Sequence, residues 1–203
     1  ILLPTGYLNI AIFDQKIEGF QSNTFIGTGF VLANAGSQSS DGFEFDLVVS
    51  PTESIDLAIS GLFMDPIYDS FPNSSAGDLT GTMPSNISED TISSTVTWNW
   101  SSNNWDGYFR LSHLYASEAK MLENPAWQSI LEAAGNGIKT QDTLNFSAGL
   151  EKENLSIMFW GKNINDDKYL ISAFPAVADP TSSSFFGYPN AYRSYGLTIN
   201  YMF

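Results

Sequence analysis

The chain has 203 residues, and its 22 Asp and Glu against 8 Lys and Arg give a formal net charge of -14. This charge repels phosphate and disfavours nucleic acid as a partner, and the absence of cysteine excludes disulfides and zinc–thiolate sites. Only 15% of the residues are charged and 14% are aromatic, whereas about 25% of a typical soluble domain is charged. The composition suits a protein that faces lipid on one side, although no apolar run approaches the ~18 residues of a transmembrane helix.

Eight segments alternate apolar and polar side chains with a period of two, which is the pattern of a strand with two different faces. In chain order, their apolar positions are Leu8, Ile10 and Ile12; Phe43, Phe45, Leu47 and Val49; Ile55, Leu57, Ile59 and Phe63; Ile92, Val96, Trp98 and Trp100; Trp105, Phe109 and Leu111; Leu144, Phe146, Ala148 and Leu150; Leu155, Ile157 and Phe159; and Tyr195, Leu197, Ile199, Tyr201 and Phe203. We therefore predict about eight strands.

The predicted connections alternate between short and long. Short polar turns lie at residues 50–54, 101–104 and 151–154. Long irregular links lie near residues 21–40, 65–90, 116–141 and 164–191. Short periplasmic turns alternating with long extracellular loops are the plan of an outer-membrane barrel. We predict an all-β fold: an antiparallel transmembrane β-barrel segment of about eight strands, connected as a meander.

One long link carries the start and stop signals of a short helix. Asn124 can cap the helix, Pro125 suits its first position, and Gly135 ends it. The side chains expected to share its apolar stripe, packed on the rest of the loop, are Trp127, Ile130, Leu131 and Ala134.

Charged residues in the central predicted strands separate from the apolar ones. Those on the more polar face are Glu44, Asp46, Asp56, Asp106, Arg110, Glu151 and Lys162. A charge that faces lipid costs up to ~2–4 kcal/mol at mid-bilayer, whereas a charge in a wet lumen costs little. We therefore expect hydrocarbon against the uncharged face. A soluble β-sandwich or lectin, with its apolar face inward, is the alternative that alternation leaves open.

Aromatic side chains collect at one predicted level of the strands. Five of them flank the turn at 101–104 or end the chain: Trp98, Trp100, Trp105, Tyr201 and Phe203. Aromatic rings with a polar N–H or O–H gather at membrane interfaces, where one part is apolar and the other is wet. We expect Trp98, Trp100 and Trp105 to form an interfacial girdle.

The C-terminal stretch resembles the end of TonB-dependent receptors. Residues 159–169 read FWGKNINDDKY, similar to the family's "G-x-N-L-x-D-x-x-Y" with Ile164 where Leu is usual. Residues 192–203 read YRSYGLTINYMF, similar to its final strand "R-x-(Y/F)-G-hydrophobic-x-hydrophobic-x-(Y/F)-x-F". Upstream, LNIAIF at 8–13, Gln21, NAG at 34–36 and DGFE at 41–44 resemble the family's "N-x-A-x-F … Q … N-A-G … G-x-E" segment.

The resemblance implies a plug domain followed by a barrel of about 22 strands. Residues 1–203 would then be the C-terminal portion of that barrel, with the plug and earlier strands upstream. Because such a portion leaves two unpaired edges, we expect an open, curved sheet. Tyr201 and Phe203 resemble the terminal signal that the barrel-assembly machinery reads.

The implied function is import across the bacterial outer membrane, energised by the TonB complex through the missing N-terminal region. The solute would be a small molecule or oligosaccharide: a siderophore, a cobalamin-like compound or a glycan. Candidate contacts in the extracellular loops are Phe71, Trp127, Phe185, Phe186 and Tyr188, although loop packing is the commoner use of such residues.

Two other classes of protein compete with this interpretation. A complete small eight-strand barrel with a passive pore or structural role has the right strand number. A hydrolase needs a histidine with partners, and the sole histidine, His113, is expected on the outward face with Leu111 and Tyr115. We therefore predict no enzyme, no catalytic residues, no metal ligands and no cofactor.

Overall fold

A computed structural model describes residues 5–25, 29–176 and 184–203. Its elements, in chain order, are β1 (Thr5–Phe25), β2 (Phe30–Thr52), β3 (Ile55–Ser70), β4 (Asp90–Ser102), β5 (Trp105–Lys120), α1 (Pro125–Ala133), β6 (Ile138–Lys152), β7 (Leu155–Lys162), β8 (Leu170–Pro175), β9 (Phe185–Pro189) and β10 (Ser194–Tyr201). No helix in these ranges is long and apolar enough to cross a membrane.

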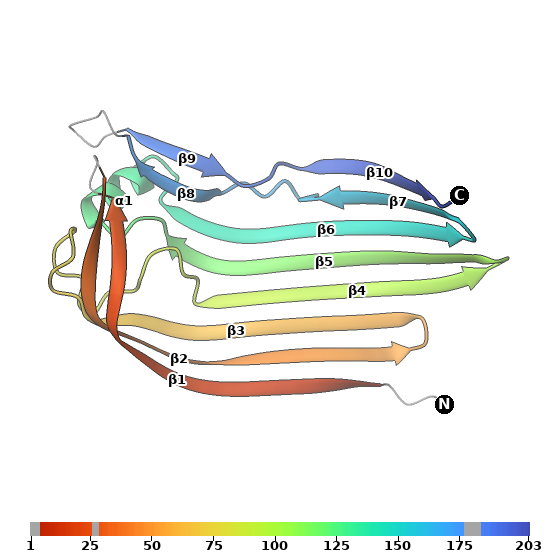
Figure 1. Cartoon of the computed structure of the whole chain (residues 1–203), viewed down its shortest axis with the longest axis horizontal. Helices are drawn as coiled ribbons and strands as arrows, with labels where there is room; N and C mark the ends of the chain where they lie inside the picture. Colours follow the sequence, from red (N-terminus) through yellow and green to blue (C-terminus); the bar gives the residue numbers. More distant parts are fainter. Residues whose placement is uncertain (1–4, 26–28, 177–183) are drawn as a thin grey trace.

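Eight of the strands form one antiparallel sheet in the order β1-β2-β3-β4-β5-β6-β7-β10 (Figure 1). Each of the eight alternating segments lies in one of these strands, so the predicted all-β meander is confirmed. The sheet is open, because β1 and β10 are its two edges rather than neighbours. The additional strands, β8 and β9, form a separate hairpin.

The three predicted short turns are confirmed, and all lie at one end of the sheet, called here the short-turn end (Figure 1). Each has two residues between its strands, at 53–54, 103–104 and 153–154. Asn103 and Asn104 have φ values of 51° and 61°, the left-handed conformation that two-residue hairpin turns require and that asparagine tolerates. The long connections lie at the opposite, long-loop end.

The prediction of an irregular link at 21–40 is wrong. β1 and β2 stay paired along this stretch, from Phe20 opposite Ala35 to Phe25 opposite Phe30, and residues 26–28 lie outside the described ranges. Their ends turn across the long-loop end of the sheet (Figure 1). This two-stranded ribbon satisfies its backbone groups by cross-strand hydrogen bonds. It can therefore form without alternating apolar residues, so the sequence pattern did not predict it.

The link predicted at 164–191 is only partly irregular, because it contains β8 and β9 on either side of 177–183, which lie outside the described residues. The helix in the preceding link is confirmed. Asn124 caps it by accepting hydrogen bonds from the N–H groups of Ala126 and Trp127, and Pro125 is its first residue. Gly135 follows in the left-handed conformation, with a φ of 77°.

The predicted apolar stripe of α1 is half wrong. Leu131 is buried and Trp127 half-buried, but Ile130 and Ala134 are exposed. The buried place next to Leu131 is taken by Gln128, whose side chain bonds the Met121 and Leu122 N–H groups and the Gly137 carbonyl oxygen. The helix is therefore fixed partly by polar contacts that close its own loop.

The buried apolar cores lie at the long-loop end, among the loops and the outer ends of the strands. One contains Tyr68, Phe71 and Leu79, and the other contains Met121, Leu131 and Ala173. The apolar side chains of the sheet remain open instead, since Ile199 is 60% exposed. No described element covers that face, so its partner is not another layer of the described chain.

Candidate functional site

The apolar face of the sheet is continuous from strand to strand. One hydrogen-bonded row runs across six strands through Ile55, Trp98, Phe109, Ala148, Phe159 and Leu197. The next row contains Leu57, Val96, Leu111 and Phe146. Because opposite residues in a ladder point to the same side, these rows form one apolar surface, called here the apolar face.

The opposite, polar face carries the predicted charges. Asp56, Thr97, Arg110 and Ser147 form one row across it, and the Arg110 Nε atom donates to the Thr97 hydroxyl at 3.1 Å. Strand alternation places all seven predicted charged residues on this side. The predicted separation of these charges from the apolar face is confirmed.

Further charges, which sequence alternation did not reveal, lie on the apolar face at its two limits. At the long-loop limit these are Asp14, Asp41, Asp65, Asp90 and Asp142, each two residues beyond an apolar position of its strand. On β6, Asp142 at this limit and Lys152 at the short-turn limit are ten residues apart, matching the ~9–11 residues of a transmembrane strand. The uncharged band has the length of a membrane crossing.

The five aromatic residues expected at one level lie at the short-turn end and make separate contacts there. Trp98 is 52% exposed on the apolar face and packs against Trp100 with ring centroids 4.8 Å apart. The Lys152 ammonium lies 5.7 Å from the ring centroid of Trp105. The rings of Tyr201 and Phe203 meet edge-on at 5.2 Å. Amphipathic rings therefore line the short-turn limit of the uncharged band.

Glycines opposite aromatic residues are a second feature that sequence reasoning missed. Gly149 faces Tyr108 and Gly107 faces Trp100 across neighbouring strands. A Cβ on Gly149 would lie 2.2 Å from the Tyr108 ring, and one on Gly107 would lie 2.4 Å from the Trp100 ring. Each ring therefore occupies the space that a side chain would fill. Only the strand register reveals these pairs.

The long loops are packed together at their end of the sheet. The Tyr68 hydroxyl donates to the Glu123 carboxylate at 2.6 Å, joining the end of β3 to the loop before α1. Phe71 is completely buried and meets Tyr68 edge-on at 5.1 Å. The prediction of Phe71 as a ligand contact is therefore corrected, because its ring is enclosed in a loop core and has no exposed surface.

The β8–β9 hairpin brings three of the other candidates into one region. Phe185 packs on the cluster of Met121, Leu131 and Ala173, close to α1. Phe186 and Tyr188 are 55% and 56% exposed, and their rings lie 5.6 and 5.8 Å from that of Phe174. The hairpin thus has a packed face and an open aromatic face. Trp127, on α1, is half-buried.

A hollow of about 530 Å³ lies on the polar face near the short-turn end. Its polar lining includes Asn99, Asp106, Tyr108, Glu151 and Asn200. Carboxylates and no basic side chain line it, so the hollow suits neutral or cationic groups.

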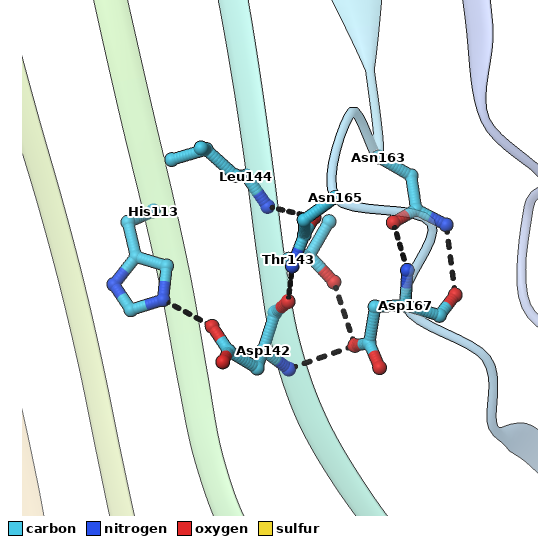
Figure 2. Close-up of polar contacts among 7 residues, drawn as sticks. All are labelled: His113, Asp142, Thr143, Leu144, Asn163, Asn165 and Asp167. Carbon is cyan, nitrogen blue, oxygen red and sulfur yellow. Dashed lines mark hydrogen bonds and ion pairs between the residues drawn. The ribbon is translucent and has the colours of Figure 1, made fainter.

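His113 lies on the apolar face, opposite Ser94 and Leu144, as expected. Its Nε2 atom is 2.5 Å from Oδ1 of Asp142 (Figure 2). Both side chains are partly exposed, and no serine nucleophile bonds to the imidazole in the described structure. No group of three or more His, Asp or Glu side chains in residues 5–25, 29–176 and 184–203 could hold a metal ion.

Asp166, at the base of the β8–β9 hairpin, sits between two cations. Its Oδ2 atom is 3.0 Å from the Lys168 Nζ and 4.0 Å from the Arg193 Nη2. The hydrogen bond from Lys168 lowers the pKa of the Asp166 carboxyl below its ordinary value. Both cations at this point are therefore partly neutralised and give the loop end little capacity to attract anions.

Solved structures with a similar arrangement of strands include uptake and import receptors. The ferric yersiniabactin uptake receptor FyuA from Yersinia pestis matches over 96% of this chain and 27% of its own, with a TM-score of 0.72 and 16% identity. The ferric-catecholate import receptor Fiu from E. coli K12 matches over 97% of this chain and 25% of its own, with a TM-score of 0.67 and 14% identity. The siderophore receptor PiuA from Acinetobacter baumannii matches over 96% of this chain and 26% of its own, with a TM-score of 0.66 and 15% identity. At these identities the likeness concerns the fold.

The chain spans about a quarter of the length of these receptors. No curated protein matches its sequence. The family described as "TonB dependent receptor-like, beta-barrel" matches residues 2–164, and these barrels reside in the bacterial outer membrane and are not enzymes. This chain, with its membrane-length uncharged band and open antiparallel sheet, belongs to the TonB-dependent receptor β-barrel family.

Proposed function

We propose that this chain is the C-terminal part of the barrel wall of a TonB-dependent receptor that imports a scarce solute. The observation that carries the proposal is the two-faced sheet: an uncharged band of membrane length on one side and charged residues on the other. The polar face suits a barrel whose interior is wet.

The unpaired edges of the sheet support the idea that further strands complete the barrel. β1 and β10 each have one neighbour, and open edges within lipid leave backbone groups without partners. The chain also covers only about a quarter of the solved receptors. We propose that the remainder of the receptor supplies earlier strands and a plug. A closed eight-strand passive barrel would need β1 to pair with β10, and no described contact favours it.

The long-loop end, which outer-membrane barrels turn toward the outside, is the proposed place of solute capture. Phe186 and Tyr188 on the open face of the hairpin are the best candidates for contact, and Trp127 and Phe185 are further candidates. Acidic residues outnumber basic ones on these loops, so a neutral or cationic solute gains more from the local field than an anionic one does. A siderophore, a cobalamin-like compound or a glycan fits the proposal within that limit.

The proposed function requires two protein partners and the lipid bilayer. The TonB complex would act through the remainder of the receptor. The barrel-assembly machinery would read the terminal strand with Tyr201 and Phe203, and the bilayer would contact the apolar face. The solute itself is the fourth component, and the loop residues above are where it would bind.

The proposal is tested by uptake in cells that carry the full-length protein. Labelled ferric hydroxamate, cobalamin and maltooligosaccharide are offered in turn, with and without a functional TonB. Uptake of one probe that requires TonB and falls in the Phe186→Ala, Tyr188→Ala double variant is the expected result. Equal passage of small solutes with and without TonB would support the passive barrel and overturn the proposal.

A further inference from the structure

β7 leaves its neighbour before β6 ends. The main-chain pairing of the two strands runs from Leu155 opposite Lys152 to Gly161 opposite Phe146. β6 continues outward to Ile138, paired with β5 on its other side. The backbone groups of Leu144 and Asp142 on the β7 side would therefore lack partners near the long-loop limit of the uncharged band. Unsatisfied backbone groups at that depth are costly.

The segment after β7 takes over this pairing with one backbone N–H group and two side chains, those of Asn165 and Asp167. Figure 2 shows the two side chains beside β6. The Ile164 N–H donates to the Leu144 carbonyl oxygen at 2.8 Å. The Asn165 Oδ1 accepts from the Leu144 N–H at 3.0 Å, and its Nδ2 donates to the Asp142 carbonyl oxygen. A carboxamide offers the same donor and acceptor as a peptide group. Asn165 thus stands in for one peptide of a missing strand.

Asp167 continues the substitute ladder by one more position. Its Oδ2 accepts from the Asp142 N–H at 2.8 Å and from the Thr143 hydroxyl at 3.4 Å. The outward side chain of Asp142 in turn meets His113 on β5. The side chains of Asn165 and Asp167 therefore close the edge of β6 at Leu144 and Asp142, just beyond the end of its pairing with β7.

The same segment is tied to the chain that returns from β9. Asn163 is 3% exposed; its Oδ1 accepts from the Asp167 N–H at 2.8 Å, and its Nδ2 donates to the carbonyl oxygens of Asp167 and Ala191, each at 2.9 Å. The Asn190 Nδ2 also donates to the Asp167 carbonyl oxygen, at 2.8 Å. Both strands that carry the hairpin are thus joined to β6 at one point.

We propose that Asn163, Asn165 and Asp167 form a clasp that positions the β8–β9 hairpin over the long-loop end. Asn163 and Asp166 have φ values of 49° and 58°, so the segment makes tight turns instead of running on as a strand. The clasp lets the chain leave the sheet without leaving its edge bare. The positioning of the hairpin by the clasp does not depend on the proposed function. The further consequence, that the clasp orients a solute-binding surface, rests on the proposed function.

A competing explanation is that apolar packing alone holds the hairpin. Ala173, Leu170 and Phe185 contact the cluster around Met121 and Leu131, which is independent of the clasp. If the clasp is broken and the cluster is left intact, apolar packing alone would keep the hairpin in place, whereas a positioning clasp would release it.

The test uses the full-length protein in detergent, with spin labels on Ser172 in β8 and Ser94 in β4. Asn165→Leu keeps the side-chain size and removes both hydrogen bonds that the carboxamide makes to the backbone of Leu144 and Asp142. Asn154→Leu, in the turn at the other end of β6, is the matched control. We expect the distance distribution to broaden in Asn165→Leu and to stay unchanged in Asn154→Leu. Amide exchange of Leu144, whose N–H loses its acceptor, should rise about tenfold in Asn165→Leu, as loss of a protecting hydrogen bond predicts.

Faster exchange at Leu144 with an unchanged distance distribution would overturn the proposal, because the clasp would then only close the edge. Should Asn165→Leu fail to assemble, Asp167→Asn serves as the milder variant, since it keeps one oxygen acceptor and loses the charge. We expect it to broaden the distribution less, and no broadening would equally refute the positioning role. Neither measurement involves a solute, so the result is independent of whether uptake is found.

Discussion

Placing one positive charge on either face of β4 tests the assignment of lipid to the apolar face. Val96 lies in the apolar row between Leu57 and Leu111, and its neighbour Thr95 points to the polar face between Ala58 and Ser112. Val96→Lys and Thr95→Lys therefore introduce the same side chain at the same height. Only the surroundings of the ammonium group differ between the two variants.

The expected cost depends on the depth of the site. Val96 is six residues from Asp90, which marks the long-loop limit, and four from Trp100, at the aromatic level. A lysine near mid-bilayer on the lipid side costs ~2–4 kcal/mol, whereas a lysine in a wet lumen costs little. Because each 1.36 kcal/mol is tenfold in an equilibrium constant, Val96→Lys should lower the folding equilibrium about 30- to 900-fold. Ile92→Lys, nearer the boundary, should cost only ~0–1 kcal/mol.

The assay is urea titration of the full-length protein in phospholipid vesicles, followed by the change in gel mobility on heating. The expected order of destabilisation is Val96→Lys first, then Ile92→Lys, with Thr95→Lys close to the unsubstituted protein. If Thr95→Lys destabilised the protein as much as Val96→Lys, the apolar face would not be the one in contact with hydrocarbon.

Three further outcomes are expected. Gly149→Ala should destabilise the sheet by ~1–3 kcal/mol, because its methyl group would overlap the Tyr108 ring; a double-mutant cycle with Tyr108→Ala checks this, and full additivity would contradict it. Asn124→Ala should cost the α1 segment ~1 kcal/mol by removing its cap, read from amide exchange of residues 126–133, with Asn124→Asp as the control that keeps the acceptor. The pKa of Asp166 is lowered in the folded protein, so its contribution to stability is present above the ordinary carboxyl pKa and is lost as the pH falls through the lowered value. Asp166→Asn should abolish this acid dependence of the stability. An unchanged pH profile of the stability in Asp166→Asn would contradict this expectation.

The strands of the sheet were predictable because lipid imposes a simple selection on them. Val96 and Phe146 must be apolar and their neighbours need not be, so alternation and short turns show through the sequence. The paired stretch from Phe20 to Ala35 lies beyond the other strands of the sheet, where that selection is absent, so the sequence predicted a loop there.

The loop end was harder to predict because its packing is set by contacts distant in sequence. Phe71 looks like a surface aromatic until Tyr68 and Leu79 enclose it. Gln128 looks like an exposed helix residue until its amide closes the loop. The segment at 163–167 reads as a polar turn, and only the position of β6 shows that Asn165 replaces a peptide. The five outward aspartates were likewise invisible until the strand register aligned them.

Those aspartates also indicate how the strands lean within the membrane. Asp14 and Asp142 mark the same boundary, but the hydrogen-bonded row that reaches Asp142 begins at Ile10, four residues short of Asp14. Four residues at ~3.4 Å, over five strand spacings of ~4.8 Å, correspond to a slant of roughly 30°. At that slant, the ten-residue stretch of β6 between Asp142 and Lys152, ~34 Å long, covers a vertical height of about 29 Å, close to the ~30 Å of a bilayer's hydrocarbon layer. The stepwise offset of the aspartates from strand to strand is therefore the offset expected where a flat membrane surface crosses tilted strands.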